Sequence, residues 1–248
     1  MARDDDDADE DARAHIASGG VQRAAVFVPL LRWRLRLSGD DDDDDDDADD
    51  GSEDAGTSGF DVLLQSRAST LRAHASEGSF PGGKFDRESG DARDVDTALR
   101  ESEEEVGLTR ADVDVYGWRL PVVLSRDMIS VRPIVGEIIN RAYSPVINAD
   151  EVAEVFTAPL EMFLRDDARH RFDDWAWPNA ERAIRVHYFD YDGRVIWGLT
   201  AAILIRVASR VYGREPEFQE KTDEGVSVWD VYGENGAARV REPPRSSM

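Results

Sequence analysis

The sequence contains no cysteine, and only two of its 30 basic residues are lysines, Lys84 and Lys221. The absence of cysteine excludes a disulfide, a thiolate metal site and a cysteine nucleophile. No run reaches the roughly 20 apolar residues that a membrane-spanning helix needs. The first ten residues are acidic, whereas a signal peptide begins with basic residues. These absences predict a cytoplasmic protein that does not engage a membrane.

The charge of the chain is strongly one-sided, with 53 acidic residues against 30 basic ones and a net charge of -23. Such a charge repels nucleic-acid backbones, so nucleic acid is not expected as a partner. A phosphate-bearing substrate would need local basic side chains or bound cations. Many acidic residues with almost no lysine are typical of salt-rich cytoplasms, where ions screen self-repulsion. We therefore expect a halophilic host; a mesophilic protein with acidic loops is the alternative.

Composition along the chain predicts one folded domain. The 248 residues are 41% hydrophobic, which is enough for a single sizeable core over residues 21–213. Residues 1–20 form an acidic leader that we expect to be disordered, and residues 214–248 form a polar tail. A run of aspartates dominates residues 38–59, which we interpret as a solvated loop insertion rather than a cation-binding segment.

Patterns of apolar residues predict a mixture of strands and helices. Strands are expected at 24–37, 60–66 and 131–139, and in a hairpin around Asp192 and Gly193. Helices are expected at 94–106, at 150–156 (leading to 160–164) and at 200–212. For the first helix, Asp91 or Asp94 is placed to cap the start and Gly107 to stop the end.

Three glutamates in the first predicted helix carry the strongest chemical signal. Glu101, Glu104 and Glu105 are spaced so that a helix places all three carboxylates on one face, where they repel one another. Hard divalent cations with oxygen ligands remove that repulsion. Upstream, Pro81-Gly82-Gly83 supplies a tight turn where backbone can approach a ligand. The alternative is an ordinary solvated acidic helix face.

The segment from Phe80 to Leu108 resembles the Nudix box. Its ending, Arg100-Glu101-Ser102-Glu103-Glu104-Glu105-Val106-Gly107-Leu108, matches the box at the charged and glycine positions. The loop from Gly83 to Arg100 is about three residues longer than in the usual box. Ala92 stands where the box has a further glutamate. Three acidic residues of this loop could replace that glutamate: Asp86, Glu88 and Asp91.

The resemblance implies an α+β Nudix fold, in which a mixed β-sheet is sandwiched between helices (α/β/α), and hydrolysis of a diphosphate. Glu101, Glu104 and Glu105 would be the ligands of Mg²⁺ or Mn²⁺. Together with Arg100, which would brace them through a salt bridge, they form the expected catalytic set. Gly83 could add its carbonyl to the metal shell. Water would attack phosphorus, and the general base stays open.

The segment just before the box resembles the signature of the coenzyme A diphosphatases within this superfamily. Arg67, Ala68, Arg72 and Phe80 to Gly83 fall in register, whereas Gln65 replaces a threonine and Ser76 a glycine. This implies cleavage of coenzyme A or acyl-coenzyme A to 3',5'-ADP and 4'-phosphopantetheine or its acyl form. Substrate contacts are expected from Arg67, Arg72, Gly82 and Gly83. Guanidinium groups suit a 3'-phosphate; alternatively, both arginines pair with carboxylates.

Downstream segments extend the resemblance. Residues 148–156 with Pro159 and Leu160 are similar to a stretch shared with other Nudix proteins. Residues 196–201 are similar to the turn into the last helix of the coenzyme A subgroup. Glu151 or Glu154 could add a carboxylate to the metals, although a role on a helix face is favoured. His170 and His187 are interpreted as isolated, which disfavours a histidine metal site or a catalytic triad.

Two other functions remain open from the sequence. The chain could hydrolyse another nucleoside diphosphate derivative, such as ADP-ribose or a dinucleotide. It could also be a catalytically silent Nudix fold that binds nucleotides. Retention of three mutually repelling glutamates favours an enzyme over a binding module.

Overall fold

The computed structural model describes residues 22–32, 59–67, 77–118, 120–125, 127, 129–176, 183–225 and 229. The expected leader, nearly all of the acidic insertion and the last part of the tail lie outside these residues. The proposed domain limits therefore stay predictions. Within the described residues, no helix combines the length and apolar character needed to cross a membrane.

The main sheet is built around β1 (Gln22–Arg32), which is buried on both faces. It pairs in parallel with β7 (Ile129–Ile138) and antiparallel with β2 (Phe60–Arg67) and β4 (Gly82–Lys84). Four strands complete the sheet: β3 (Gly78–Ser79), β5 (Val113–Val115), β6 (Val123–Leu124) and β8 (Val152–Pro159). A strand buried on two faces needs a continuous apolar run, which explains the sequence of β1.

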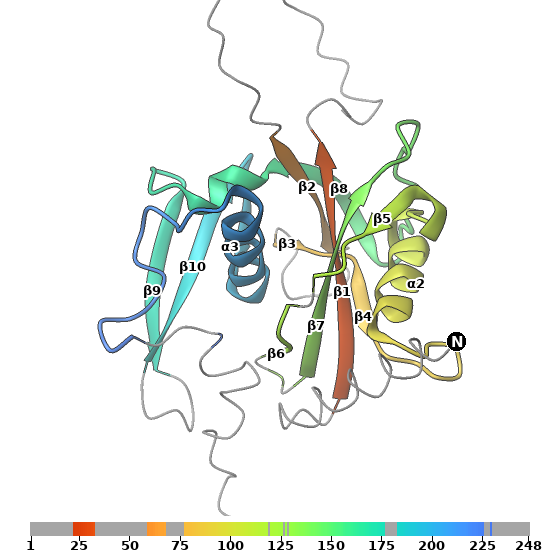
Figure 1. The fold of residues 1–248 in the computed structure, drawn as a ribbon, viewed down its shortest axis with the longest axis horizontal. Helices are drawn as coiled ribbons and strands as arrows, with labels where there is room; N and C mark the ends of the chain where they lie inside the picture. The colour runs from red at the N-terminus through yellow and green to blue at the C-terminus, as the bar shows by residue number, and fades with distance from the viewer. Residues whose placement is uncertain are drawn as a thin grey trace, which may run out of the picture.

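Two helices cover the two faces of this sheet (Figure 1). α2 (Asp94–Val106) packs on one face with Phe27 and Leu63, and α3 (Gly198–Tyr212) packs on the other in the same cluster as Val28 and Leu64. The 3₁₀ turn η1 (Arg110–Asp112) connects α2 to β5, and η2 (Leu160–Leu164) connects β8 to β9. The predicted α+β fold with a mixed sheet between helices is confirmed.

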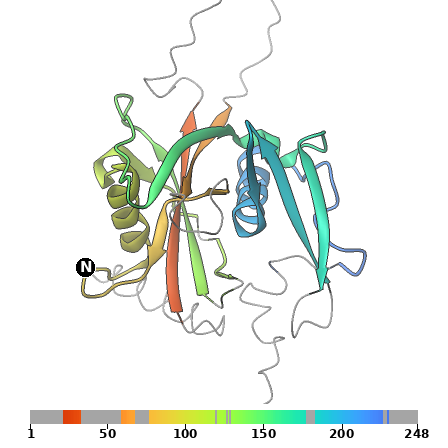
Figure 2. The same ribbon diagram turned by 180° about the vertical axis from the view of Figure 1, so that it is seen from behind.

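A second, three-stranded sheet lies beyond α3, as the view from behind also shows (Figure 2). It consists of β9 (His170–Ala176), β10 (Ala183–Tyr191) and β11 (Arg194–Trp197) in antiparallel order. The expected hairpin is confirmed: Asp192 and Gly193 have positive φ angles of 49° and 74°, which suits a two-residue turn. α3 follows β11 directly, so the turn into the last helix is also as expected.

The helix expected at residues 150–156 is wrong. This segment contributes most of β8, which pairs antiparallel with β2 and sets Phe156 opposite Leu64. Val152, Val155 and Phe156 have helical spacing, but valine and phenylalanine also favour strands. The edge of β2 offers backbone hydrogen bonds to this segment, which pairs with it as β8. The residues that follow, 160–164, form the 3₁₀ turn η2.

The second sheet also buries two histidines that the sequence analysis interpreted as isolated, and that interpretation is wrong. His170 Nε2 lies 3.0 Å from His187 Nδ1, and the two rings are stacked. Phe218, from the segment after α3, stacks on His170 with ring centroids 3.9 Å apart. His187 Nε2 donates to the Glu220 carbonyl at 3.0 Å. The segment that follows α3 is thus joined to this sheet through both imidazoles.

His187 gives the fold a pH dependence with a defined sign. Burial lowers the pKa of His187 to about 4, against 6.5 for an ordinary histidine. Between these values the unfolded chain binds a proton that the folded chain does not, so stability is full above pH 6.5 and falls toward pH 4. The difference corresponds to roughly 3 kcal/mol of unfolding free energy.

We expect His187→Gln to remove this part of the pH dependence, because glutamine does not titrate and its amide can still donate to Glu220. Urea denaturation of both proteins at pH 7 and pH 4 measures it, and only the difference between the two proteins is read, since many carboxylates titrate near pH 4. Parallel pH profiles for wild type and variant would contradict the assignment to His187.

Candidate functional site

The helix α2, which carries the glutamates, covers the predicted residues but has a different N-cap from the predicted one. Its N-cap is Arg93, and Asp96 accepts the Arg93 backbone N–H at 2.9 Å, so neither Asp91 nor Asp94 is the cap. Asp91 instead pairs with Arg100, and Asp94 pairs with Arg23 and Arg132. The expected end is confirmed, since Gly107 adopts a φ of 70° and closes the last turn.

Arg100 is the centre of an ion-pair network on α2. Its guanidinium binds Asp91 through two contacts of 3.1 Å and donates to Glu101 at 2.9 Å and to Glu104 at 3.0 Å. The salt bridges expected of Arg100 are therefore present. Among the three acidic residues left open for the missing glutamate, Asp91 is the one that pairs with Arg100. Asp86 instead accepts hydrogen bonds within its own loop.

Asp91 and Arg100, the central pair of this network, are both charged. Burial acts to raise the pKa of Asp91, but the hydrogen bonds from Arg100, the Asp86 backbone and Thr97 outweigh it, and the pKa is lowered. The hydrogen bond with Asp91 raises the pKa of Arg100. An ionised Asp91 under Arg100 fixes the guanidinium, which then orients the glutamates that follow it on the helix.

Glu101 lies against the glycine turn. A β-carbon on Gly83 would overlap the Glu101 carboxylate, so a larger residue there would displace this side chain. Burial raises the pKa of Glu101, and the negative charges of Glu104 and Glu151 add to that rise while Arg100 opposes it. The pKa is raised because the stabilisation of the carboxylate by Arg100 does not offset the effects of burial and of the neighbouring negative charges.

Glu105 is the buried member of the trio, with 6% of its surface exposed. One carboxylate oxygen, Oε2, accepts from Gln65 Nε2 and from the Gly82 backbone N–H, both at 2.9 Å. A side chain at Gly82 would come within 2.6 Å of Val26 Cα, which explains the glycine. Glu105 thereby links α2 to β2 and β4.

These residues fit a hard divalent cation by donor chemistry. In the described part of the chain, no three carboxylate or imidazole groups are already gathered as a metal site. However, Asp91, Glu101 and Glu104 all bind the one guanidinium of Arg100, so three carboxylates share a single positive charge. The buried Gln65 Oε1 has no hydrogen-bond partner among the described residues. Oxygen donors alone, with excess negative charge, suit Mg²⁺ or Mn²⁺.

Other predicted site residues are only partly described. Arg67 is the last residue of β2, and Arg72 lies outside the described residues. Glu154 is bound by Arg194, whose guanidinium also contacts Asp192. Glu154 therefore lies on strand β8, where it pairs with Arg194, and not on a helix face. The negative charge of Glu151 contributes to the raised pKa of Glu101.

The contact of Gln65 with Glu105 is not among the expectations from the sequence, where Gln65 is only a replacement for threonine. One signal was available: Gln65 lies in the apolar run Phe60–Arg67, at a position that shares a strand face with Leu63. A buried glutamine in such a run needs a polar partner. The sequence did not reveal that this partner is Glu105, 40 residues away.

Comparison with known proteins shows which family this sequence resembles. The NUDIX domain family matches residues 53–195. Nudix hydrolase 22 of Arabidopsis thaliana is 46% identical over 165 residues, 64% of this chain and 53% of that protein. The peroxisomal coenzyme A diphosphatase NUDT7 of Mus musculus is 33% identical over 164 residues, covering 64% of this chain and 66% of that protein.

A solved MutT/nudix family protein from Enterococcus faecalis is similar at 16% identity and a TM-score of 0.43, over 77% of this chain and 62% of that one. The chain spans about half the length of the two Arabidopsis relatives that it matches. The family match, in contrast, covers more than half of this chain and includes the whole of α2 and the glycine turn. The chain belongs to the NUDIX domain family.

Proposed function

We propose that this chain hydrolyses the diphosphate linkage of a small nucleotide-derived substrate with the help of Mg²⁺ or Mn²⁺. The observation that carries the proposal is the approach of Glu101 to Gly83 and of Glu105 to Gly82, while Arg100 binds Glu101 together with Glu104 and is outnumbered by the carboxylates that share it. A cluster that only stabilised the fold would have no need of that excess, because repulsion between carboxylates lowers stability.

Each residue has a defined role in this proposal. A bound divalent cation lowers the pKa of the attacking water and neutralises charge on the leaving phosphate. Glu101, Glu104 and Glu105 hold the cations. Arg100, fixed by Asp91, orients Glu101 and Glu104. Gly83 carries no side chain, so the turn lies directly against the Glu101 carboxylate and does not cover it.

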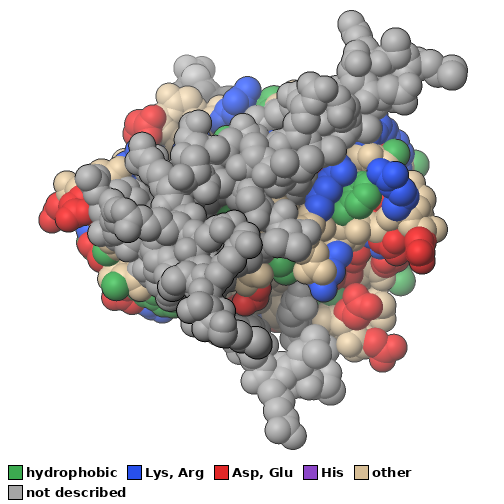
Figure 3. Space-filling model, turned by 90° about the horizontal axis from the view of Figure 1, so that it is seen from below, with side chains coloured by type: hydrophobic (Ala, Val, Ile, Leu, Met, Phe, Trp, Pro, Cys, Tyr) green, Lys and Arg blue, Asp and Glu red, His purple; other side chains and the backbone are tan. Residues whose placement is uncertain are grey.

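For the substrate, we propose coenzyme A or acyl-coenzyme A, cut to 3',5'-ADP and 4'-phosphopantetheine or its acyl form. Two observations support this choice: the signature with Arg67 and Arg72 ahead of the glycine turn, and the similarity to a mouse protein named as a coenzyme A diphosphatase. The charge of the surface is mixed despite the negative net charge. On the face seen from below, Arg and Lys side chains lie among Asp and Glu (Figure 3).

The substrate proposal is tested by comparing coenzyme A with dephospho-coenzyme A, which lacks only the 3'-phosphate, and with ADP-ribose. If arginines bind the 3'-phosphate, kcat/KM favours coenzyme A by at least about tenfold, the value of one charged hydrogen bond. Arg72→Ala removes this preference and leaves dephospho-coenzyme A cleavage unchanged. Arg171→Ala, on β9, is the matched control. Equal rates for the three substrates, or faster ADP-ribose cleavage, would contradict the coenzyme A assignment.

The composition also bears on how the assay is run. We propose that the chain is adapted to concentrated salt, because a net charge of -23 is poorly tolerated where ions do not screen it. The screening length falls from roughly 10 Å at 0.1 M salt to 3 Å at 1 M. The comparison is therefore made at both salt concentrations, with the melting temperature recorded in each.

A further inference from the structure

Gln65 is a buried polar side chain whose position calls for an explanation. It lies on β2, paired with Ser79 of β3 on one side and Val155 of β8 on the other, and only 2% of its surface is exposed. It shares a strand face with Leu63, which packs in the core under α2. The side chain is therefore enclosed between the sheet and the glutamate helix.

The amide of Gln65 is satisfied on one side only. Its Nε2 donates to Glu105 Oε2 at 2.9 Å, but its Oε1 is buried and has no hydrogen-bond partner in the described part of the chain. An unpaired buried carbonyl oxygen costs about 1–3 kcal/mol, so such atoms are rare in native proteins. The nearby glutamates cannot supply the missing donor, because an ionised carboxylate only accepts.

A cation with its shell of water supplies what Gln65 Oε1 lacks. Water held by a cation donates hydrogen bonds, and the cation itself is attracted to a carbonyl oxygen. On the other side, Glu105 Oε2 already receives two donors, Gln65 Nε2 and the Gly82 N–H, which fix the rotation of the carboxylate. One half of the amide thus acts directly on Glu105, and the other half, Oε1, is buried next to it and needs a donor.

We propose that Gln65 is a positioning residue of the cation site: its Nε2 fixes the carboxylate of Glu105, and its Oε1 accepts from the water shell of the cation. The inference rests on the proposed function, since it requires cations at the glutamates. Gln65 does not touch the reacting phosphorus. Its effect is on how tightly the cation is held, and partners of this kind change metal affinity by roughly 10–100-fold.

The test measures Mn²⁺ binding by the full chain without substrate, from the loss of the electron paramagnetic resonance signal of free Mn²⁺. Gln65→Met keeps the length of the side chain and removes both its donor and its acceptor. Gln219→Met is the matched control, because that side chain is exposed and, within the described residues, donates to the exposed Asp223. We expect Gln65→Met to weaken Mn²⁺ binding at least tenfold without lowering the melting temperature, and the control to bind like wild type.

The outcomes separate this inference from the proposed function. If wild type binds Mn²⁺ and Gln65→Met binds it equally well, the role of Gln65 is overturned while the cation site stands. If the variant is less stable but binds Mn²⁺ normally, Gln65 is structural only, and the inference is also overturned. If wild type binds no Mn²⁺, the proposed function itself fails. Should Gln65→Met not fold, Gln65→Asn, which is one methylene shorter, is measured by the same criteria.

Discussion

Replacing Glu104 by glutamine is expected to lower kcat/KM for coenzyme A by at least about a hundredfold, because loss of an outer partner of a metal ligand alone costs 10–100-fold. The fold is expected to survive. The Glu104 side chain is 55% exposed, and its one recorded contact in the described chain is the surface pair with Arg100. Such a pair contributes about 0.3–0.5 kcal/mol, which is a change of roughly 1–2 °C in melting temperature for a domain of this size.

Glu103 provides the matched control for this experiment. It is exposed on the same helix, one residue from Glu104, and its replacement by glutamine removes the same charge. Because it is outside the proposed cation site, Glu103→Gln is expected to keep wild-type activity. Steady-state kinetics with a thermal melt of each variant are sufficient. Equal activity of Glu104→Gln and Glu103→Gln would contradict the metal assignment, since only net charge would then matter.

Asp94→Ala is expected to lower the free energy of unfolding by roughly 3–5 kcal/mol, which is the usual effect of breaking a buried ion pair from one side. Asp94 is fully buried in the first turn of α2. One carboxylate oxygen lies 2.6 Å from Arg23 Nε and the other 3.3 Å from Arg132 Nε. Arg132 is itself 4% exposed, so removal of Asp94 leaves its charge in the core.

Asp96→Ala is the appropriate comparison, because Asp96 lies in the same helical turn but is partly exposed and closes the cap with Arg93. A lost cap costs about 1 kcal/mol. Urea denaturation followed by circular dichroism measures both variants. In the double variant Asp94→Ala/Arg132→Met, part of the stability should return, since the buried charge of Arg132 is removed together with that of Asp94. If Asp94→Ala is no more destabilising than Asp96→Ala, Asp94 does not anchor the helix as we describe.

Local patterns predicted those elements whose signals lie within a few residues. α2 was placed at its observed residues because its charged face and Gly107 mark it directly. The hairpin at Asp192 and Gly193 was found for the same reason. β8 was misread as a helix because its apolar spacing suits both structures, and the choice is made by pairing with β2. The sequence of residues 150–156 alone does not indicate this pairing with a distant strand.

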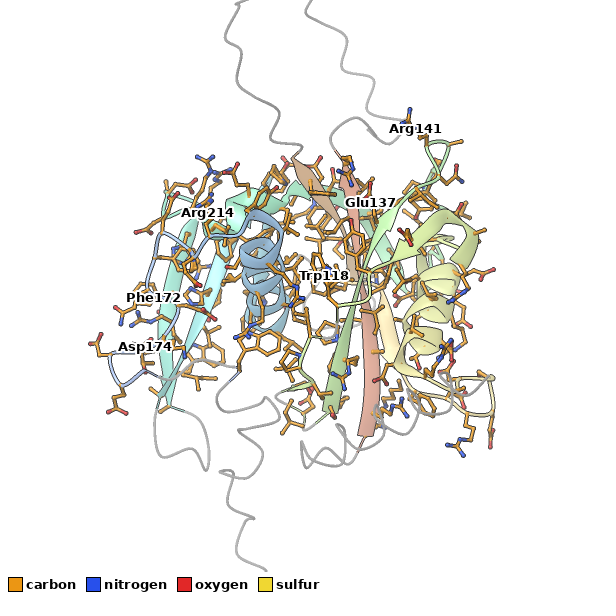
Figure 4. All side chains as sticks on the ribbon, in the orientation of Figure 1. Trp118, Glu137, Arg141, Phe172, Asp174 and Arg214 are labelled. Carbon is orange, nitrogen blue, oxygen red and sulfur yellow. The ribbon has the colours of Figure 1, made fainter. Side chains whose placement is uncertain are left out.

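The same distinction holds for the site. The helix spacing of the three glutamates was visible in the sequence, but the partners that orient them were not. Gln65 meets Glu105 across 40 residues, and Asp94 meets Arg23 across 71. Cross-strand register likewise brought His170 to His187, two residues that nothing in their local sequence connects. Figure 4 shows Phe172, from the same strand as His170, on the β9 side of the molecule, far from α2.

The most direct test of the account is cleavage of coenzyme A in ¹⁸O-enriched water, with the products resolved by mass. With Mg²⁺ or Mn²⁺ present, we predict 3',5'-ADP and 4'-phosphopantetheine, with one ¹⁸O atom in the phosphate of one of them. With the cation removed by a chelator, we predict no product. Intact coenzyme A in the presence of both cations, at low and high salt, or equal cleavage with and without the chelator, would contradict the claim that the glutamates of α2 hold a catalytic cation.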